Sequence, residues 1–175
     1  KKMSMLLDRL FMLSNLETKA VPFSFETVKI KNYMEKFYEH MSDEFEYAHG
    51  TINFSSNCSD ETEVRVDTLQ LNRVFDNLVA NSKLYSGVSN PIIDISLEES
   101  EDEVIINFQD NGNGVLEEFL PHIFDSLYRS DSARHSHGNG LGLTISKRIV
   151  EIHGGKISAQ NNHGLLIIIS LPKVK

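Results

Sequence analysis

The sequence predicts an α/β fold of the α+β two-layer type, in which helices cover one face of a mostly antiparallel mixed sheet. Two observations lead to this class. Segments with helical apolar spacing alternate with short runs rich in β-branched and aromatic residues, and several of these runs form pairs around polar turns. The length of 175 residues suits one domain with an appended helix, and a hydrophobic content of 40% can fill its core.

The composition excludes several classes of protein. A net charge of -8 and a pI near 5.3 argue against a nucleic-acid partner, because phosphate backbones require clustered Lys and Arg. Cys58 is the only cysteine, which excludes an internal disulfide and fits a reducing compartment. No apolar run reaches the roughly 18 residues of a membrane helix. We therefore expect a soluble, cytoplasmic piece, whose parent protein can still be membrane-anchored.

The first segment predicts a helix that ends near Thr18. Four apolar residues fall on one face of it: Met3, Leu6, Leu10 and Leu13. Because no cap precedes this pattern, we expect a truncated helix that continues upstream, with residues 1–20 as helix and linker and residues 21–175 as the domain. An amphipathic helix that simply packs on the domain is a nearly equal alternative.

The next segment predicts a short strand followed by a long helix. Residues 23–25 alternate like a strand, and Thr27 can cap a helix that runs from Val28 towards His49, where Gly50 supplies a stop. Six further strands are then expected, the first two around a polar turn and the others as two hairpins: 51–54, 63–66, 92–97, 104–108, 156–160 and 165–171.

The helix at 68–85, with Asp67 as its N-cap, has an unusual polar face. Asn77 and Asn81 lie one turn apart, and Tyr85 continues the same face. Asparagine is a mediocre helix former, so the pair suggests ligands for a hydrated magnesium ion. Hydrogen bonding of both side chains across a loop is an equally weighted alternative.

Two glycine clusters predict a nucleotide site. Asp110, Gly112 and Gly114 follow the apolar run 104–108, so the carboxylate emerges at a strand end where the chain must turn. A second cluster, with Gly138, Gly140 and Gly142, leads into a helix whose first amides attract phosphate. Neither cluster has the spacing of a P-loop or a Rossmann fingerprint. The polar stretch 130–139 has the composition of a lid, and its His135 and His137 lack a third metal ligand nearby.

Five ordered segments together resemble the ATP-binding catalytic domain of bacterial sensor histidine kinases, over roughly residues 20–175. They are NLVAN (77–81), DNGNG (110–114), IFDSLYR (123–129), GNGLGL (138–143) and KRIVEIHGG (147–155). The helix before them is similar to the end of the second helix of that family's dimerisation domain. The resemblance implies a homodimeric parent and a fragment that is itself monomeric.

The resemblance also implies roles for individual residues. Asp110 would accept a hydrogen bond from the adenine amino group, Gly112 and Gly114 would let the base approach, and Asn81 would hold Mg²⁺. Asn77 would lie near the phosphates and Tyr85 would border the nucleotide. The box that begins at Gly138 would bring four amides to the phosphate chain, those of Gly140, Leu141, Gly142 and Leu143. Arg129 would approach the γ-phosphate and neutralise charge during transfer.

The implied reaction is transfer of the γ-phosphate of ATP to a histidine, which leaves ADP. The acceptor would lie in a dimerisation domain absent from this chain, because no histidine precedes Val21. A cognate response regulator would act downstream. Two other classes stay open: a nucleotide-binding module without transfer activity, and a gyrase-like ATPase. The second is weaker because Asn77 stands where a water-activating carboxylate is needed.

Three positions depart from the family pattern. A basic residue is usual where this chain has Leu84, and Lys83 is displaced by about 100° around the helix. The last glycine box, Gly-x-Gly-Thr in the family, reads NHGL at 162–165, so we expect an asparagine-tolerated left-handed turn without the threonine hydroxyl. Leu127 replaces a frequent aromatic residue.

Overall fold

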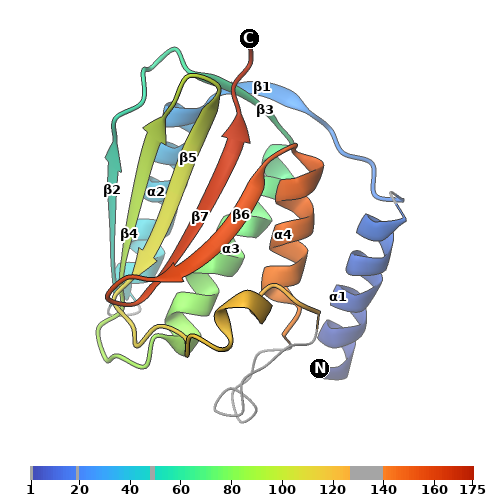
Figure 1. Ribbon diagram of the computed structural model, residues 1–175, viewed down its shortest axis with the longest axis vertical. Coiled ribbons are helices and arrows are strands. Elements are labelled where there is room, and N and C mark those ends of the chain that lie inside the picture. The colour runs from blue at the N-terminus through green and yellow to red at the C-terminus, as the bar shows by residue number, and fades with distance from the viewer. Residues whose placement is uncertain (1, 19, 48–49, 127–139) are drawn as a thin grey trace.

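The computed structural model describes residues 2–18, 20–47, 50–126 and 140–175. Helices lie against one face of a five-stranded sheet, and none of the described helices covers the other face (Figure 1). The helices and strands are α1 (Lys2–Glu17), β1 (Glu26–Lys29), α2 (Ile30–Tyr47), β2 (Thr51–Ser56), β3 (Glu63–Val66), α3 (Thr68–Tyr85), β4 (Ile92–Glu99), β5 (Glu103–Asp110), a 3-10 turn (Leu120–His122), α4 (Gly142–Ile152), β6 (Lys156–Asn161) and β7 (Leu165–Pro172). The predicted two-layer α/β class is confirmed.

The five-stranded sheet is mixed, as the sequence predicts. Its order is β2-β4-β5-β7-β6. Strand β2 pairs with β4 in parallel, and the other three pairs are antiparallel. Both predicted hairpins, β4–β5 and β6–β7, are present in the expected places.

Alternation along β5 aims one row of side chains at the helices. Val104, Ile106, Phe108 and Asp110 are buried, whereas the residues between them are partly exposed. The Phe108 ring stacks on Phe75 of α3, with ring centroids 5.4 Å apart. Because side chains alternate with a period of two, Asp110 continues this inward row at the end of the strand. The pleat itself therefore places a carboxylate at the edge of the core.

The structure corrects the prediction for residues 23–28. The strand is β1, at Glu26–Lys29, and it pairs with β3 in a separate two-stranded sheet. Thr27 and Val28 lie inside this strand, so α2 begins only at Ile30. The predicted strand at 23–25 is absent, because the Phe23 and Phe25 rings contact His153 instead, with centroids 5.6 and 5.2 Å from its ring. Strands β2 and β3, although neighbours in sequence, belong to different sheets.

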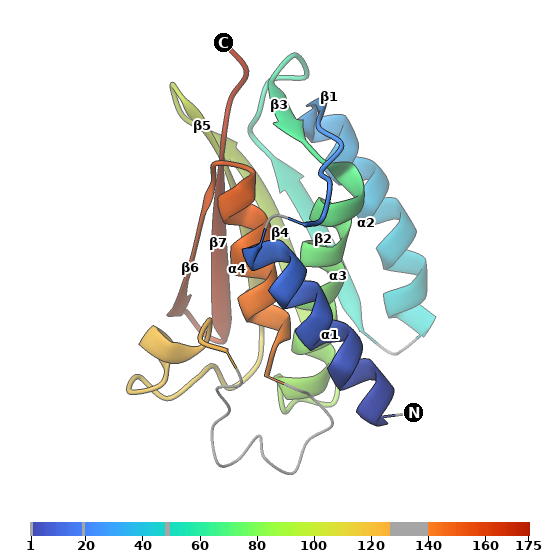
Figure 2. The same ribbon diagram turned by 90° about the vertical axis from the view of Figure 1, so that its right-hand side faces the viewer.

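Helix α1 packs beside α4, on the side away from the sheet (Figure 2). Leu13 and Leu16 are buried, whereas Leu7 and Phe11 are 60% and 71% exposed. Within the described residues, none of the helices combines the length and apolar character needed to traverse a bilayer.

Candidate functional site

Helix α3 positions the predicted asparagines and begins as the sequence predicts. The Asp67 side chain caps it by accepting the Gln70 N–H at 3.0 Å, and it also accepts the N–H of Ser24 at 2.8 Å. His153 accepts the Asp67 N–H at 2.9 Å through Nε2. The start of α3 is therefore fixed to the segment before β1 and to the end of α4.

The Asp110 carboxylate is 8% exposed and is oriented by backbone donors. Its Oδ1 accepts the N–H groups of Gly112 and Leu165, each at 2.9 Å. Among the described residues, its Oδ2 accepts a hydrogen bond only from the Ser82 hydroxyl, at 3.4 Å. Two donors thus hold one oxygen, and the other oxygen retains capacity to accept a hydrogen bond from a ligand.

Two neighbours anchor the first half of the turn that follows Asp110. Asn111 pairs with the start of β4, where its Oδ1 accepts the Ile92 N–H at 2.8 Å. Asn113 donates its backbone N–H to the Ser86 carbonyl at the end of α3, at 3.0 Å. A Cβ at Gly112 would lie 2.6 Å from the Ser86 backbone, so only glycine permits this close contact.

Asn77 joins α3 to α4. Its Nδ2 donates to the buried Ser146 hydroxyl at 2.9 Å. A Cβ at Gly142 would lie 2.3 Å from Asn77 Oδ1, so the first turn of α4 presses against the amide. The two helices lie side by side in both views (Figures 1 and 2). Asn77 therefore positions the glycine-led end of α4.

Asn81 differs from Asn77 in its contacts. Its side chain is half-buried and makes no hydrogen bond to any described residue. Leu84 and Tyr85, further along α3, are 45% and 40% exposed. Lys83 does not occupy the place of Leu84, since its ammonium lies 4.8 Å from the centroid of the Phe45 ring on α2. The C-terminal end of α3 thus presents the Asn81 amide, which has no described partner, beside the exposed Leu84 and Tyr85.

The first backbone amides of α4 have no acceptor among the described residues. Gly140 has a φ of 66°, a left-handed conformation that glycine adopts without strain. Leu141 is fully buried, Gly142 begins the helix, and no side chain of the described residues caps it. Because the first amides of a helix have no intrahelical acceptor, those from Gly142 onward, including Leu143, remain available to an anion.

Several predicted features lie outside the described residues. They are Leu127, Arg129, the lid-like stretch 130–139 with His135 and His137, and Gly138. In the part of the chain that the structure describes, no three His, Cys, Asp or Glu side chains gather as a metal site.

The turn between β6 and β7 persists but differs from the expectation. The left-handed residue is His163, with a φ of 52°, and not Asn162; Gly164 follows with a φ of 141°. A Cβ at Gly164 would lie 2.0 Å from the Asp110 carbonyl oxygen. The turn therefore rests directly on the backbone of Asp110, and Leu165 uses its amide rather than a side-chain hydroxyl to hold the carboxylate.

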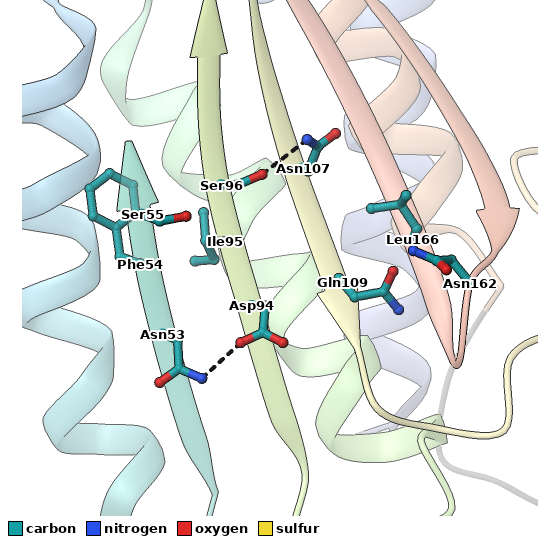
Figure 3. A pocket seen from close by; sticks show the side chains of 10 residues that line it. All are labelled: Asn53, Phe54, Ser55, Asp94, Ile95, Ser96, Asn107, Gln109, Asn162 and Leu166. Carbon is teal, nitrogen blue, oxygen red and sulfur yellow. Dashed lines mark hydrogen bonds between the residues drawn. The ribbon is translucent and has the colours of Figure 1, made fainter. Parts of the chain in front are cut away.

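A separate hollow of about 360 Å³ lies on the open face of the sheet (Figure 3). Asn53 donates to Asp94 at 2.7 Å and Asn107 donates to Ser96 at 3.0 Å across neighbouring strands. Asp110 points to the opposite, helix-covered face. The hollow is thus distinct from the Asp110 site. Its polar side chains make the open face of the sheet compatible with contact with water.

The sequence does not single out four contacts of the site. They involve Ser82, Ser146, Asn161 and the amide of Leu165. Serine and asparagine are common at helix ends and in turns, and a backbone amide has no residue signature. Only their partners, 28 to 69 positions away in sequence, distinguish these residues.

Comparisons with known proteins identify the family of this chain and its relatives. Residues 66–175 match the family described as "Histidine kinase-, DNA gyrase B-, and HSP90-like ATPase". The sensor protein SrrB of Staphylococcus aureus is 29% identical over 180 residues, which cover 99% of this chain and 30% of SrrB. The histidine-protein kinase AfsQ2 of Streptomyces coelicolor is 36% identical over 112 residues, or 62% of this chain and 20% of AfsQ2. This chain thus spans less than a third of these relatives.

Solved structures share the fold. The catalytic domain of histidine kinase ThkA superimposes with a TM-score of 0.74 at 24% identity, covering 87% of this chain and all of that domain. Full-length ShkA, solved in complex with AMPPNP, gives a TM-score of 0.81 at 19% identity over 98% of this chain and 36% of ShkA. Homology to sensor histidine kinases, which the five segments indicate, is confirmed. The chain belongs to the family of histidine kinase-, DNA gyrase B- and HSP90-like ATPases.

Proposed function

We propose that this chain is the ATP-binding catalytic domain of a two-component sensor histidine kinase. It would transfer the γ-phosphate of ATP to a histidine on a dimerisation domain. The observation that carries the proposal is the Asp110 carboxylate in a chain of this family. Two amides hold its Oδ1, whereas the Ser82 hydroxyl, at 3.4 Å, is the one described donor to its Oδ2. A carboxylate accepts hydrogen bonds only, so it suits the amino group of adenine.

The phosphates would lie between the uncapped start of α4 and the end of α3. Amides from Gly140 to Leu143 would contact them, supported by the helix dipole. Arg129 would neutralise charge on the transferred phosphoryl group, while residues 130–139 would form the lid. Asn77 would act on the phosphates through its hold on Gly142, and Tyr85 would border the nucleotide.

Asn81 would hold the magnesium ion. Its half-buried amide has no hydrogen-bond partner among the described residues, whereas the amide of Asn77 is engaged by Ser146. An amide oxygen suits hard Mg²⁺, which keeps most of its water and takes further ligands from the phosphates. The bound ion would neutralise charge on the phosphate oxygens.

Helix α1 would be the end of the dimerisation domain, with residues 1–20 as helix and linker. Its exposed Leu7 and Phe11 support a partner helix, because apolar side chains on one helix face gain stability when covered. The parent would be a homodimer in the cytoplasm or anchored to a membrane from that side. A cognate response regulator would take the phosphoryl group; the homologous ThkA is solved in complex with such a regulator, TrrA.

One transfer assay tests the proposal. The chain is mixed with γ-labelled ATP, Mg²⁺ and the parent's dimerisation domain, and phosphate on that domain is measured beside free phosphate. We expect acid-labile label on the dimerisation domain. Rapid release of free phosphate without label would instead indicate a gyrase-like ATPase, and ATP binding with neither outcome would indicate a binding module.

The gyrase-like alternative lacks its water-activating group. Asn77 cannot act as a general base, and its amide is committed to Ser146. The silent binding module is favoured by Leu84, because no cation stands at that position of α3 and Lys83 lies over Phe45. The assay above separates both from the kinase.

A further inference from the structure

We infer that Asn161 is a positioning residue for nucleotide binding, which holds the turn after Asp110 in the conformation that receives the base. This inference rests on the proposed function. Asn161 is the last residue of β6 and lies 46 positions from the residue that it contacts, Val115. It is not in any of the five segments that resemble the histidine kinases.

The Asn161 side chain binds the backbone of Val115 in the manner of a neighbouring strand. Its Oδ1 accepts the Val115 N–H at 2.9 Å, and its Nδ2 donates to the Val115 carbonyl at 2.6 Å. The same Nδ2 donates to Glu117 Oε1 at 2.9 Å. A primary amide has one acceptor oxygen and two N–H donors. These bonds use the oxygen and both N–H groups, and so they define the orientation of the amide.

This contact anchors the second half of the turn, at Gly114 and Val115. A Cβ at Gly114 would lie 2.5 Å from Asn161 Oδ1, so the glycine lets the turn approach the amide. Gly114 has a φ of 67°, which favours glycine at this position. Asn161 thus complements the anchors at β4 and at the end of α3.

The same hairpin also holds Asp110. In the register of β6 and β7, Asn161 pairs with Leu165, whose N–H donates to Asp110 Oδ1. Both ends of the turn, Asp110 and Val115, are therefore hydrogen-bonded to the β6–β7 hairpin. Loss of the Asn161 amide would release one end and leave the other in place.

The contribution to binding is separable from folding. Asn161 is exposed and contributes nothing to the apolar core, and water can satisfy Val115 when the amide is removed. The Asp110 bonds to Leu165 and Gly112 do not involve this side chain. Truncation of the Asn161 side chain to alanine should therefore increase the mobility of the turn while the sheet and helices remain folded.

The experiment compares Asn161→Ala with Gln160→Ala in the full chain. Gln160 is the preceding residue on β6, is also an exposed amide, and makes no side-chain hydrogen bond to a described residue. Affinity for ATP and for adenosine is measured by calorimetry and competition. Exchange of the Val115 amide hydrogen and the melting temperature are measured on the same samples.

We expect Asn161→Ala to weaken the binding of ATP and of adenosine by the same factor, about three- to tenfold, because the three hydrogen bonds that hold the turn at the base end are lost. The Val115 amide should exchange faster, and Gln160→Ala should change neither quantity. Asn161→Asp should weaken binding further, because it brings a carboxylate to the Val115 carbonyl and Glu117. Adding Glu117→Gln to Asn161→Asp should restore part of the lost affinity. Gln160→Glu, which adds the same charge at the neighbouring position, should leave the affinity unchanged.

Three outcomes separate the possibilities. Lower melting temperature with unchanged affinity for both ligands would make Asn161 a structural residue only and overturn the inference. Weaker ATP binding with unchanged adenosine binding would also overturn it, by placing the effect at the phosphates. If the unsubstituted chain bound neither ligand, the proposed function itself would be wrong, and the inference with it.

Discussion

Asp110 accepts the backbone N–H of Leu165 at 2.9 Å, across 55 positions of sequence. A second amide, from Gly112, meets the same oxygen. The carboxylate is consequently oriented by the backbone and not by a hydroxyl at position 165. A leucine at that position is compatible with an ordered site, because its side chain takes no part in this contact.

The first prediction is that Asp110→Asn abolishes detectable ATP binding while the fold remains. The amide oxygen can still accept from Leu165 and Gly112, which turns the new NH₂ group towards the place of Oδ2. A donor would then face the adenine amino group, an unsatisfied pair that costs about 1–3 kcal/mol. Calorimetry with a thermal melt measures both effects.

The matched control for that change is Asp94→Asn. Asp94 lies on the open face of the sheet, where an amide oxygen can still accept from Asn53. This control should bind ATP normally. Unchanged affinity in Asp110→Asn would remove Asp110 from the site.

The second prediction concerns the isolated chain, which we expect to remain unlabelled with γ-labelled ATP. The seven histidines lie after Val21, in the domain that supplies the donor, and transfer requires an acceptor held in line with the γ-phosphate. Labelling is measured after separation on a gel at neutral and acid pH. Acid-labile phosphate on the chain alone would show that one of these histidines is an acceptor.

The third prediction is that Leu84→Lys tightens ATP binding by about 1–2 kcal/mol, with a smaller gain at high salt. Leu84 lies about 20° from Asn77 around α3 and is 45% exposed, so a lysine there can reach phosphate without burial of its stem. Affinity is measured at two salt concentrations, with Leu84→Gln as the uncharged control. A lower melting temperature without tighter binding would show that position 84 does not face the phosphates.

The fourth prediction is that Gly142→Ala destabilises the domain by about 1–3 kcal/mol, since its Cβ would lie 2.3 Å from Asn77 Oδ1. Alanine otherwise favours a helix over glycine by roughly 1 kcal/mol. In an Asn77→Ala background the same change should therefore become neutral or stabilising. Denaturant melts of the unsubstituted chain, the two single variants and the double variant measure the sign of this effect, and equal destabilisation in both backgrounds would contradict the contact.

Local patterns in the sequence were sufficient to predict several elements correctly. Asp67 as the cap of α3, the two hairpins and the place of Asp110 at the end of β5 all follow from near-neighbour sterics and the period of two along a strand. The five segments likewise identify the family, because their order and spacing are properties of the chain.

The contacts between distant segments could not be predicted from local patterns. The prediction of a strand at 23–25 and of a helix start at Val28 was wrong, because pairing with β3 stabilises a strand at β1 that the local pattern does not mark. The links from Asn77 to Ser146 and from Asn161 to Val115 join residues 69 and 46 positions apart. Such contacts depend on how whole helices and strands bury their apolar faces against one another. This packing involves the whole chain, so no single stretch of sequence predicts it.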